Sequence, residues 1–291
     1  MSGDNQDIET QPPAGPPLPV PSEDTSVELR LDPPRTRSRA GWISLLTGIV
    51  VLLIVILLLR LAVVTDYMYH SAVKDPERSI PPGDNIVAPA DGLVLYVKRF
   101  QNGEVPDIVK QGVPVRLDEM IKTTPPEAIQ DGYLIGIYMN TESVHVNRVP
   151  VDGVLAACFL YNGPHMAMSG VEKSAILTAM VPGLTSIKKV LGMEPFAISK
   201  AGDYIMKSAR ETCVYTDLRG EPVYVIRIAD YWVGNLLNWI EVGQPVTKGQ
   251  RMGVITWGSQ TDICFPSSEN MTIHVSVGDY VYAGETILAT R

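Results

Sequence analysis

The sequence predicts an α+β domain dominated by β-structure, with barrel-sandwich-like half-repeats, preceded by one transmembrane helix. Three observations support this prediction. Residues 41–59 contain no charged side chain, and from about residue 80 short apolar runs alternate with Gly, Pro and Asp. Two pairs of segments in this second part also resemble each other. A chain of 291 residues has room for one such domain besides the helix and a terminal tail.

The first 40 residues are predicted to be a disordered, proline-rich tail. They hold eight of the 23 prolines and almost no large apolar residues, so they cannot bury enough surface to offset the entropy cost of ordering. The whole chain is acidic, with a formal net charge of −8. This charge argues against a general nucleic-acid-binding protein, which needs a basic face to displace counterions.

Residues 41–64 are predicted to form a transmembrane helix. As a helix, the 19 uncharged residues from Gly41 to Leu59 would span roughly 30 Å, the thickness of the hydrocarbon core. Arg60 lies near the far end, where its side chain can reach the headgroups. Forty residues precede this segment and no Ala-x-Ala site follows it, so a secretory signal is the poorer interpretation. We therefore expect a single-pass protein of the cell membrane.

The charges around the helix favour one orientation only weakly. Four arginines precede the helix, whereas Arg60, Lys74 and Arg78 lie at its end or after it. By the positive-inside rule this count favours a cytoplasmic tail and an exported domain, but so small a difference leaves the side of the membrane open. Residues 65–80 are interpreted as a linker to a globular domain at 81–291.

The globular domain is predicted to be rich in strands. Short apolar runs bounded by turn residues are typical of strands, whereas 168–200 has a more helical pattern with a break at Pro182-Gly183. The apolar residues of 175–200 recur at helical spacing, which fits a helix packed on the core better than one lying on the membrane. The predicted strands lie within 86–100, 133–140, 144–161, 222–229, 251–257, 262–265, 271–277 and 286–290.

Two internal echoes predict the half-repeats. The motif APADG at 88–92 recurs as VPVDG at 149–153, and VGQPVTKGQRMGVI at 242–255 recurs as VGDYVYAGETILAT at 277–290. In such turn-then-strand units Gly supplies a positive φ, and Pro or Asp sets the turn. Half-barrels of the lipoyl, biotinyl and membrane-fusion type look similar, so the echoes indicate an architecture rather than a function.

The cysteines and histidines do not suggest a metal site. Cys158, Cys213 and Cys264 form no CxxC pair, and an odd, scattered count argues against a disulfide framework, so we expect small buried residues. The four histidines form no HxH or HExxH pattern. The sequence also contains no GxSxG, Walker A or GxGxxG motif, which leaves common hydrolase and nucleotide-binding functions without support.

Two of four candidate places for chemistry are turns. Gly258-Ser259 lies between two predicted strands, and Asp91 lies two residues after Pro89 in the APADG motif. The structural interpretation of Gly-Ser is a turn or bulge, and that of Asp91 is a turn aspartate.

The other two candidates are histidines in predicted strands. His145 would share one face with Asn147, whereas Arg148 would lie on the other. A single histidine beside apolar residues is more often structural than catalytic. His274, near the C-terminus, is expected to pack in the same way.

Taken in order, four motifs resemble those of the phosphatidylserine decarboxylase family, especially its shorter members. They are PADG, VHVNRVPVDG, GQRMGVITWGSQTDICFP and VGDYVYAGETILA, and the third is the most specific because its Gly-Ser stands in a long matching context. The chain departs from the family pattern at Trp257, Gln260 and Asp230. It also carries Arg148 where longer members have a second His.

The resemblance implies a cofactor that the enzyme makes from itself. Ser259 Oγ would attack the carbonyl carbon of Gly258 and convert the peptide bond into an ester. Elimination and hydrolysis would then release ammonia and leave a pyruvoyl group at the start of a 259–291 piece. Gly258 suits this step because it lacks a Cβ and tolerates a strained turn. The pyruvoyl ketone supplies the electron sink that decarboxylation needs. No metal is expected.

The resemblance also implies roles for three further residues. A serine hydroxyl is a weak nucleophile until a base takes its proton, and the resemblance assigns this task to His145 with Asp91 as its partner. His145 would later act near the substrate carboxylate or donate a proton. Arg148 is a weaker candidate for contact with the anionic headgroup.

The predicted function is that of a membrane-anchored enzyme converting phosphatidylserine to phosphatidylethanolamine. The pieces 1–258 and 259–291 are expected to stay associated, and a homo-oligomer remains open. One alternative is a periplasmic adaptor of the membrane-fusion type, although the long heptad hairpin of such adaptors is missing. The other is a decarboxylase-like protein that has lost self-cleavage. The exact headgroup and lipid backbone are left open.

Overall fold

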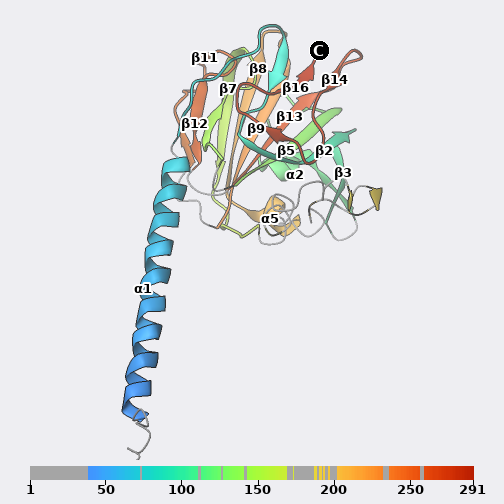
Figure 1. The fold of residues 1–291 in the computed structure, drawn as a ribbon. Helices are drawn as coiled ribbons and strands as arrows, with labels where there is room; N and C mark the ends of the chain where they lie inside the picture. The colour runs from blue at the N-terminus through green and yellow to red at the C-terminus, as the bar shows by residue number, and fades with distance from the viewer. Residues whose placement is uncertain are drawn as a thin grey trace, which may run out of the picture. The chain divides into compact units, whose positions relative to one another are not determined.

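The computed structural model describes residues 39–72, 74–110, 113–125, 127–140, 143–168, 202–231, 236–255 and 259–291, with 173, 187, 188, 190, 191, 193 and 196. It divides into two compact units, Met1–Ile56 and Leu57–Arg291, which are described separately. Strands dominate the second unit, and one long helix precedes them in the chain (Figure 1). The predicted β-dominated α+β class is thus confirmed. Most of the stretch 168–200, where we expected helix, lies outside the described residues.

Helix α1 (Arg39–Ala72) contains the predicted membrane span. Its segment Gly41–Val63 is long and apolar enough to cross a membrane, judged by length and composition. The large apolar side chains between Trp42 and Val63 are exposed, as a helix surrounded by lipid requires. The helix extends beyond the predicted span at both ends and takes in part of the predicted linker.

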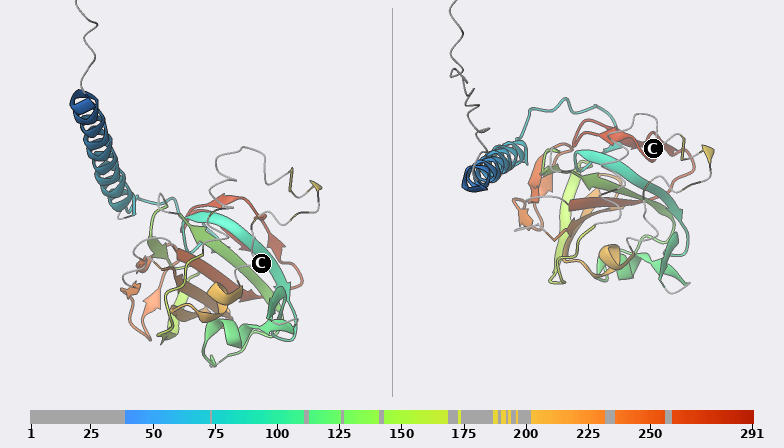
Figure 2. Two further views of the ribbon diagram at one scale, coloured as in Figure 1. Left: turned by 90° about the horizontal axis from the view of Figure 1, so that it is seen from below. Right: turned by 60° about the horizontal axis from the view of Figure 1, so that its bottom comes forward.

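Eight antiparallel strands form the main sheet, which curls strongly (Figures 1 and 2). Side chains alternate between two buried faces, so that the strands contribute to two separate hydrophobic cores. The strand order is β11 (Pro245–Val246), β7 (Gly153–Tyr161), β8 (Arg210–Asp217), β9 (Pro222–Ala229), β13 (Ser259–Pro266), β5 (Gly132–Met139), β2 (Gly92–Phe100) and β15 (Tyr280–Val281).

Each face of the main sheet is covered by smaller elements. One core includes residues of two three-stranded sheets, and the other includes residues of α2 (Leu117–Ile121) and α5 (Gly202–Lys207). The small sheets are β1 (Asn85–Val87), β16 (Ile287–Thr290) and β14 (Thr272–Ile273), and β10 (Leu236–Asn238), β12 (Arg251–Ile255) and β6 (Val146–Arg148). Strands β3 (Glu104–Lys110) and β4 (Val113–Arg116) form a separate hairpin.

The predicted half-repeats are present as two matching sets of strands. In one set β1 pairs with β16 and β2 with β15; in the other β6 pairs with β12 and β7 with β11. The sets exchange backbone hydrogen bonds: Val87 N–H donates to the Pro150 carbonyl at 3.0 Å, and Arg148 N–H donates to the Pro89 carbonyl at 2.8 Å. The sequence echoes therefore reflect real structural equivalence.

A tight contact in β5 depends on Gly136. A Cβ added there would lie 2.4 Å from the ring of Tyr96, which crosses over this position to reach Asp262. We expect Gly136→Ala to lower the free energy of unfolding by roughly 1–3 kcal/mol, because a buried ring must move. Urea titration measures this change. An unaltered midpoint would show that the ring accommodates the methyl group and that the contact is loose.

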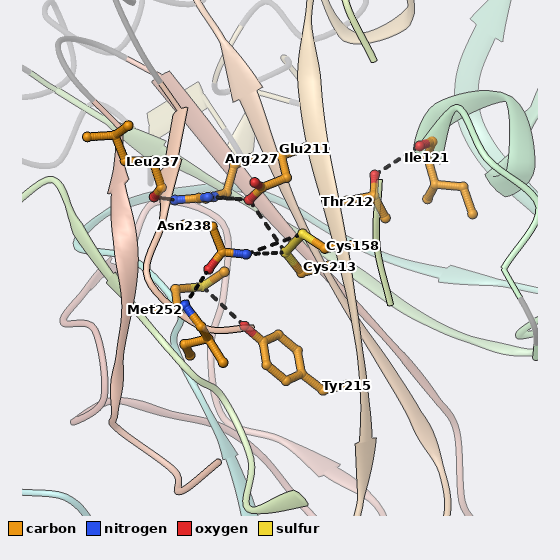
Figure 3. The surroundings of a disulfide bond; sticks show 11 residues. Ile121, Cys158, Glu211, Thr212, Cys213, Tyr215, Arg227, Leu237, Asn238 and Met252 are labelled. Atoms are coloured by element: carbon orange, nitrogen blue, oxygen red, sulfur yellow. Dashed lines mark hydrogen bonds and ion pairs between the residues drawn. A yellow bond between two sulfur atoms is a disulfide. The ribbon is translucent and has the colours of Figure 1, made fainter. Parts of the chain in front are cut away.

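Cys158 and Cys213 form a disulfide between β7 and β8, so the expectation of unpaired cysteines was wrong for these two (Figure 3). They lie directly opposite each other with a Cα–Cα distance of 4.2 Å, as in the closely spaced pairs of antiparallel strands. Fifty-five positions separate them in sequence, so the contact arises only from strand pairing. Cys264 is free and buried, as expected.

Counting the free cysteines tests this pairing directly. Under denaturing, non-reducing conditions an alkylating reagent should label Cys264 alone, and after reduction it should label all three cysteines. Intact mass gives the number of labels. We also expect Cys158→Ser to lower the free energy of unfolding by about 2–4 kcal/mol, the usual effect of losing such a cross-link. Three labels without reduction would contradict the pairing.

Candidate functional site

Ser259 begins the central strand of the main sheet. It lies opposite Met139 of β5 on one side and Ala229 of β9 on the other. The side chain is fully buried, and Oγ donates to Met139 Sδ at 3.4 Å. Residues 256–258, including the predicted cleavage partner Gly258, lie outside the described residues. Ser259 is therefore paired with a neighbouring strand on each side, directly after residues 256–258 in the sequence.

The backbone of His145 contacts Ile255, the last residue of β12. The His145 carbonyl accepts the N–H of Ile255, the last described residue before 256–258. The side chain is buried, and this burial lowers the pKa of His145 to about 4, against a smaller opposing effect of a hydrogen bond with the Ser143 backbone. The ring is therefore neutral at pH 7, and a neutral imidazole can accept a proton.

Asn147 connects the chain around His145 with β13. Its Nδ2 donates to the Pro89 carbonyl and to Thr261 Oγ1, at 3.4 Å each. Thr261 lies two residues after Ser259, on the same face of β13. The side-chain amide of Asn147 thus lies between the PADG loop and the face of the sheet that carries Ser259.

Asp91 is buried, and its carboxylate bonds to residues other than His145. Arg78 donates to both oxygens at 3.0 and 2.9 Å, and the Ala283 N–H donates at 2.7 Å. Burial raises the pKa of Asp91, while the Ala283 and Arg78 hydrogen bonds lower it. Among the described residues Asp91 has these two partners only. Its pairing with His145 in catalysis stays a prediction.

Arg148 is buried and fully engaged with neighbouring chain segments. Its Nη1 donates to the Gly249 carbonyl at 2.9 Å, and its Nη2 donates to Asp75 at 2.6 Å and to the Pro76 carbonyl at 3.1 Å. As predicted from strand parity, it lies on the face opposite to Asn147. These contacts leave little of the guanidinium for a headgroup, and its binding role stays untested.

Comparison with known proteins relates the whole domain to one family. The phosphatidylserine decarboxylase family matches residues 68–289, which include every predicted site residue. The chain belongs to the phosphatidylserine decarboxylase family. A protein of Methanocaldococcus jannaschii named as an archaetidylserine decarboxylase proenzyme is 31% identical over 230 residues, covering 78% of this chain and 89% of that protein. Phosphatidylserine decarboxylase proenzymes of Burkholderia lata and Burkholderia cenocepacia are each 28% identical over 217 residues, covering 74% of this chain and 75% of theirs.

This phosphatidylserine decarboxylase family member carries a second polar cluster that sequence analysis missed. Gln260 Nε2 donates to Tyr96 Oη at 2.7 Å and to Asp262 Oδ1 at 2.6 Å, and Tyr96 Oη donates to Asp262 Oδ2 at 2.7 Å. All three side chains are buried, on the face of β13 opposite to Ser259. Burial raises the pKa of Asp262 to about 6, against the lowering effect of these hydrogen bonds. The spacing Gly-Ser-x-x-Asp was the available signal for Asp262.

One group in the described part of the chain combines residue types that hold metals, namely Cys158, Glu211 and Cys213. Its two sulfur atoms are bonded to each other, and Glu211 forms an ion pair with Arg227 (Figure 3). Metals bind thiolates, which a disulfide does not offer, and a neighbouring guanidinium opposes a cation. The arrangement therefore supports a structural disulfide, and the absence of a catalytic metal remains a prediction.

Proposed function

We propose that this chain is a membrane-anchored proenzyme that cleaves itself between Gly258 and Ser259 and then decarboxylates phosphatidylserine. The observation that supports it best is the position of Ser259, buried at the first residue of β13, four residues after Ile255, whose N–H donates to the His145 carbonyl. Family membership supports the reaction class, since relatives over most of the chain are named decarboxylase proenzymes. It leaves the membrane-fusion adaptor without support.

Ser259 and His145 have distinct proposed tasks in self-cleavage. Ser259 Oγ attacks the Gly258 carbonyl carbon, and the neutral ring of His145 accepts the hydroxyl proton, because a free hydroxyl is too weak a nucleophile. Asp91 is also proposed to take part in this step. A pyruvoyl group derived from residue 259 supplies the electron sink for decarboxylation. His145 then holds or delivers a proton near the substrate's α-carbon.

The cleaved pieces should remain associated. Strand β13 is paired with β5 from Ser259 to Pro266 and with β9 from Ser259 to Cys264. A cut before Ser259 breaks none of these pairs. The 259–291 piece also contributes residues of β14, β15 and β16 to one of the two cores. We propose no oligomeric state.

The single-pass membrane location belongs to the same proposal. Helix α1 would keep the domain at the interface and raise its effective concentration near the lipid. The charge count favours a cytoplasmic tail weakly, and protease protection in sealed vesicles with a tag at each end tests it. A phospholipid substrate gives this anchor a purpose.

The proposed activity is tested with purified full-length protein in detergent. Dihexanoyl-phosphatidylserine should be converted to the corresponding phosphatidylethanolamine, with loss of one CO₂ followed by mass spectrometry. Treatment with borohydride, which reduces a ketone, should abolish the conversion. Unchanged substrate in the presence of correctly cleaved protein would contradict the proposed substrate class, and unchanged substrate with intact protein would favour a decarboxylase-like protein without self-cleavage.

A shortened chain tests the role of the helix. We expect residues 75–291 to fold, cleave themselves and act on dihexanoyl-phosphatidylserine, because the matched motifs and the contacts of Asp75 and Arg78 are retained. Activity on bilayer phosphatidylserine should fall, since encounter then depends on weak surface binding. Folded but uncleaved protein, as judged by circular dichroism and gel, would show that the helix belongs to the catalytic unit.

A further inference from the structure

Residues 75–80, which we call the strap, lie against both half-repeats. Ile80 packs where the turn glycines of the two echoes meet: a Cβ on Gly249 would lie 2.2 Å from Ile80 Cδ1, and one on Gly284 would lie 3.1 Å from it. Both glycines have a positive φ, +79° and +77°. Ser79 N–H donates to Glu285 at 2.8 Å. The segment predicted as part of a linker is therefore built into the domain.

Arg78 is the most buried charged group of the strap. Its side chain is 5% exposed and donates to both oxygens of Asp91. Glu285 lies 3.5 Å from its Nη1, and the ring of Tyr282 lies 5.9 Å from its guanidinium carbon. A paired, aromatic-backed guanidinium of this kind holds its partner in a fixed orientation. Arg78 thus joins the strap to the PADG loop and to the C-terminal piece.

The half-repeats supply an internal comparison for Asp91. Asp91 accepts the N–H of Ala283, the residue before Gly284, and Asp152 accepts the N–H of Lys248, the residue before Gly249. The two aspartates therefore have the same turn-stabilising role in their repeats. The two aspartates differ in one respect. Arg78 donates to Asp91, whereas no arginine in the described part of the chain donates to Asp152. The turn alone does not require that arginine.

A continuous set of contacts runs from Asp91 to the cleavage region. The Pro89 carbonyl, two residues before Asp91, accepts the backbone N–H of Arg148 at 2.8 Å and the side-chain N–H of Asn147 at 3.4 Å. Asn147 also donates to Thr261 on the Ser259 face of β13. The loop that Arg78 contacts therefore binds β6 through the Pro89 carbonyl, and Asn147 in turn links β6 to β13.

We propose that Arg78 is a positioning residue for self-cleavage, acting through Asp91 and the loop 88–91 to hold the chain around His145 against β13. This inference rests on the proposed self-cleavage and adds a residue outside the predicted site. It also assigns the strap to the maturation unit. Asp75, which bonds to Arg148 and Arg251, secures the other end of the strap.

The electrostatics of Asp91 provide a readout that a purely structural contact would not move. Burial raises the pKa of Asp91, and the charged or titratable groups facing it are Arg78, Glu285 and Tyr280. Arg78 lowers the pKa and Glu285 raises it. Removing Arg78 therefore lets Asp91 take up a proton at higher pH. Removing the charge of Glu285 acts in the opposite direction.

The test uses the full-length chain and follows self-cleavage by pulse-chase and gel. Arg78→Gln should slow cleavage about 10- to 100-fold, the usual effect of a displaced catalytic group, and Arg78→Lys should restore part of the rate. The acid limb of the cleavage rate should move to higher pH in Arg78→Gln. Asp152→Asn is the matched control, because it removes the charge of the equivalent turn aspartate while its amide oxygen can still accept the Lys248 N–H. It should cleave at the wild-type rate.

Each outcome bears on the proposal. Arg78→Gln cleaving at the wild-type rate with an unshifted pH profile would overturn it, as would equal slowing by Asp152→Asn. If Arg78→Gln does not fold, Glu285→Gln replaces it: a downward shift of the acid limb supports the proposal, and an unchanged or upward shift contradicts it. The wild-type chain is measured in parallel. An uncleaved wild type would refute the proposed function itself, a result distinct from failure of the positioning role.

Discussion

Replacing Ser259 with alanine is expected to leave the chain uncleaved and without decarboxylase activity. The variant lacks the hydroxyl that forms the ester, and without the ester oxygen as leaving group no elimination can occur to give the dehydroalanine that water converts into the ketone. The fold should persist, because Ser259 contributes one weak hydrogen bond to Met139 Sδ and its backbone pairing with β5 and β9 is kept. Gel electrophoresis and product analysis measure both losses.

The matched control for this variant is Ser276→Ala. Ser276 lies in the same 259–291 piece but is exposed. We expect it to cleave and turn over normally, so that loss of function in Ser259→Ala reports on the site. If Ser259→Ala still yields two pieces, cleavage occurs at another bond and the proposed chemistry is wrong.

Replacing His145 with alanine should slow self-cleavage or decarboxylation by about 10²–10⁴-fold, the range typical of a lost general acid or base. Because burial lowers the pKa of His145 to about 4, the ring is already deprotonated at neutral pH and needs no activation by higher pH. A variant that cleaves normally but fails to decarboxylate would assign His145 to the second reaction only. Single-turnover assays on the cleaved protein separate the two.

His274→Ala is the control for His145→Ala. His274, which we expected to pack, is instead exposed, and its Nε2 lies 2.9 Å from Thr290 Oγ1. His145 is fully buried, so its removal also creates a cavity. His145→Gln fills most of that space without an ionisable ring. Normal cleavage and turnover in both His145 variants would reduce this residue to a structural role.

The sequence predicted those parts of the fold that depend on local pattern or on repetition. The apolar run after Gly41 predicted helix α1, and the echoed motifs predicted half-repeats whose strand pairs match. Residues 88–92 and 149–153 could be recognised because both repeats need the same turn with an aspartate that accepts a backbone N–H. Patterns that arise from local geometry are visible without knowledge of tertiary contacts.

Strand β8 was missed because its polar residues have partners only in the folded protein. Its first three residues, Arg210, Glu211 and Thr212, are polar or charged. In the fold Glu211 pairs with Arg227 of the neighbouring strand, and Thr212 donates to the Ile121 carbonyl of α2 at 2.9 Å. Burial of such groups is favourable only when tertiary structure supplies the partners. The same reason explains the disulfide and the Gln260–Asp262–Tyr96 cluster.

In the candidate site, too, local motifs were visible in the sequence and tertiary contacts were not. The motif containing Ser259 could be recognised from a linear pattern, but the partner of Asp91 could not, because Arg78 lies 13 residues away in a segment that looks like a linker. Sequence order likewise says nothing about Arg148, whose guanidinium bonds to Asp75 at 2.6 Å. Ion pairs between a strap and a turn depend on how the half-repeats meet, and this is a property of the assembled fold.

The intact mass of the purified, denatured protein tests the central claim most directly. The account predicts two chains, 1–258 and 259–291, with the smaller one bearing a pyruvoyl group in place of its N-terminal serine, so that its mass is lower than that of the unmodified peptide and Edman degradation fails. A single chain of full-length mass with an ordinary serine at position 259 would contradict it.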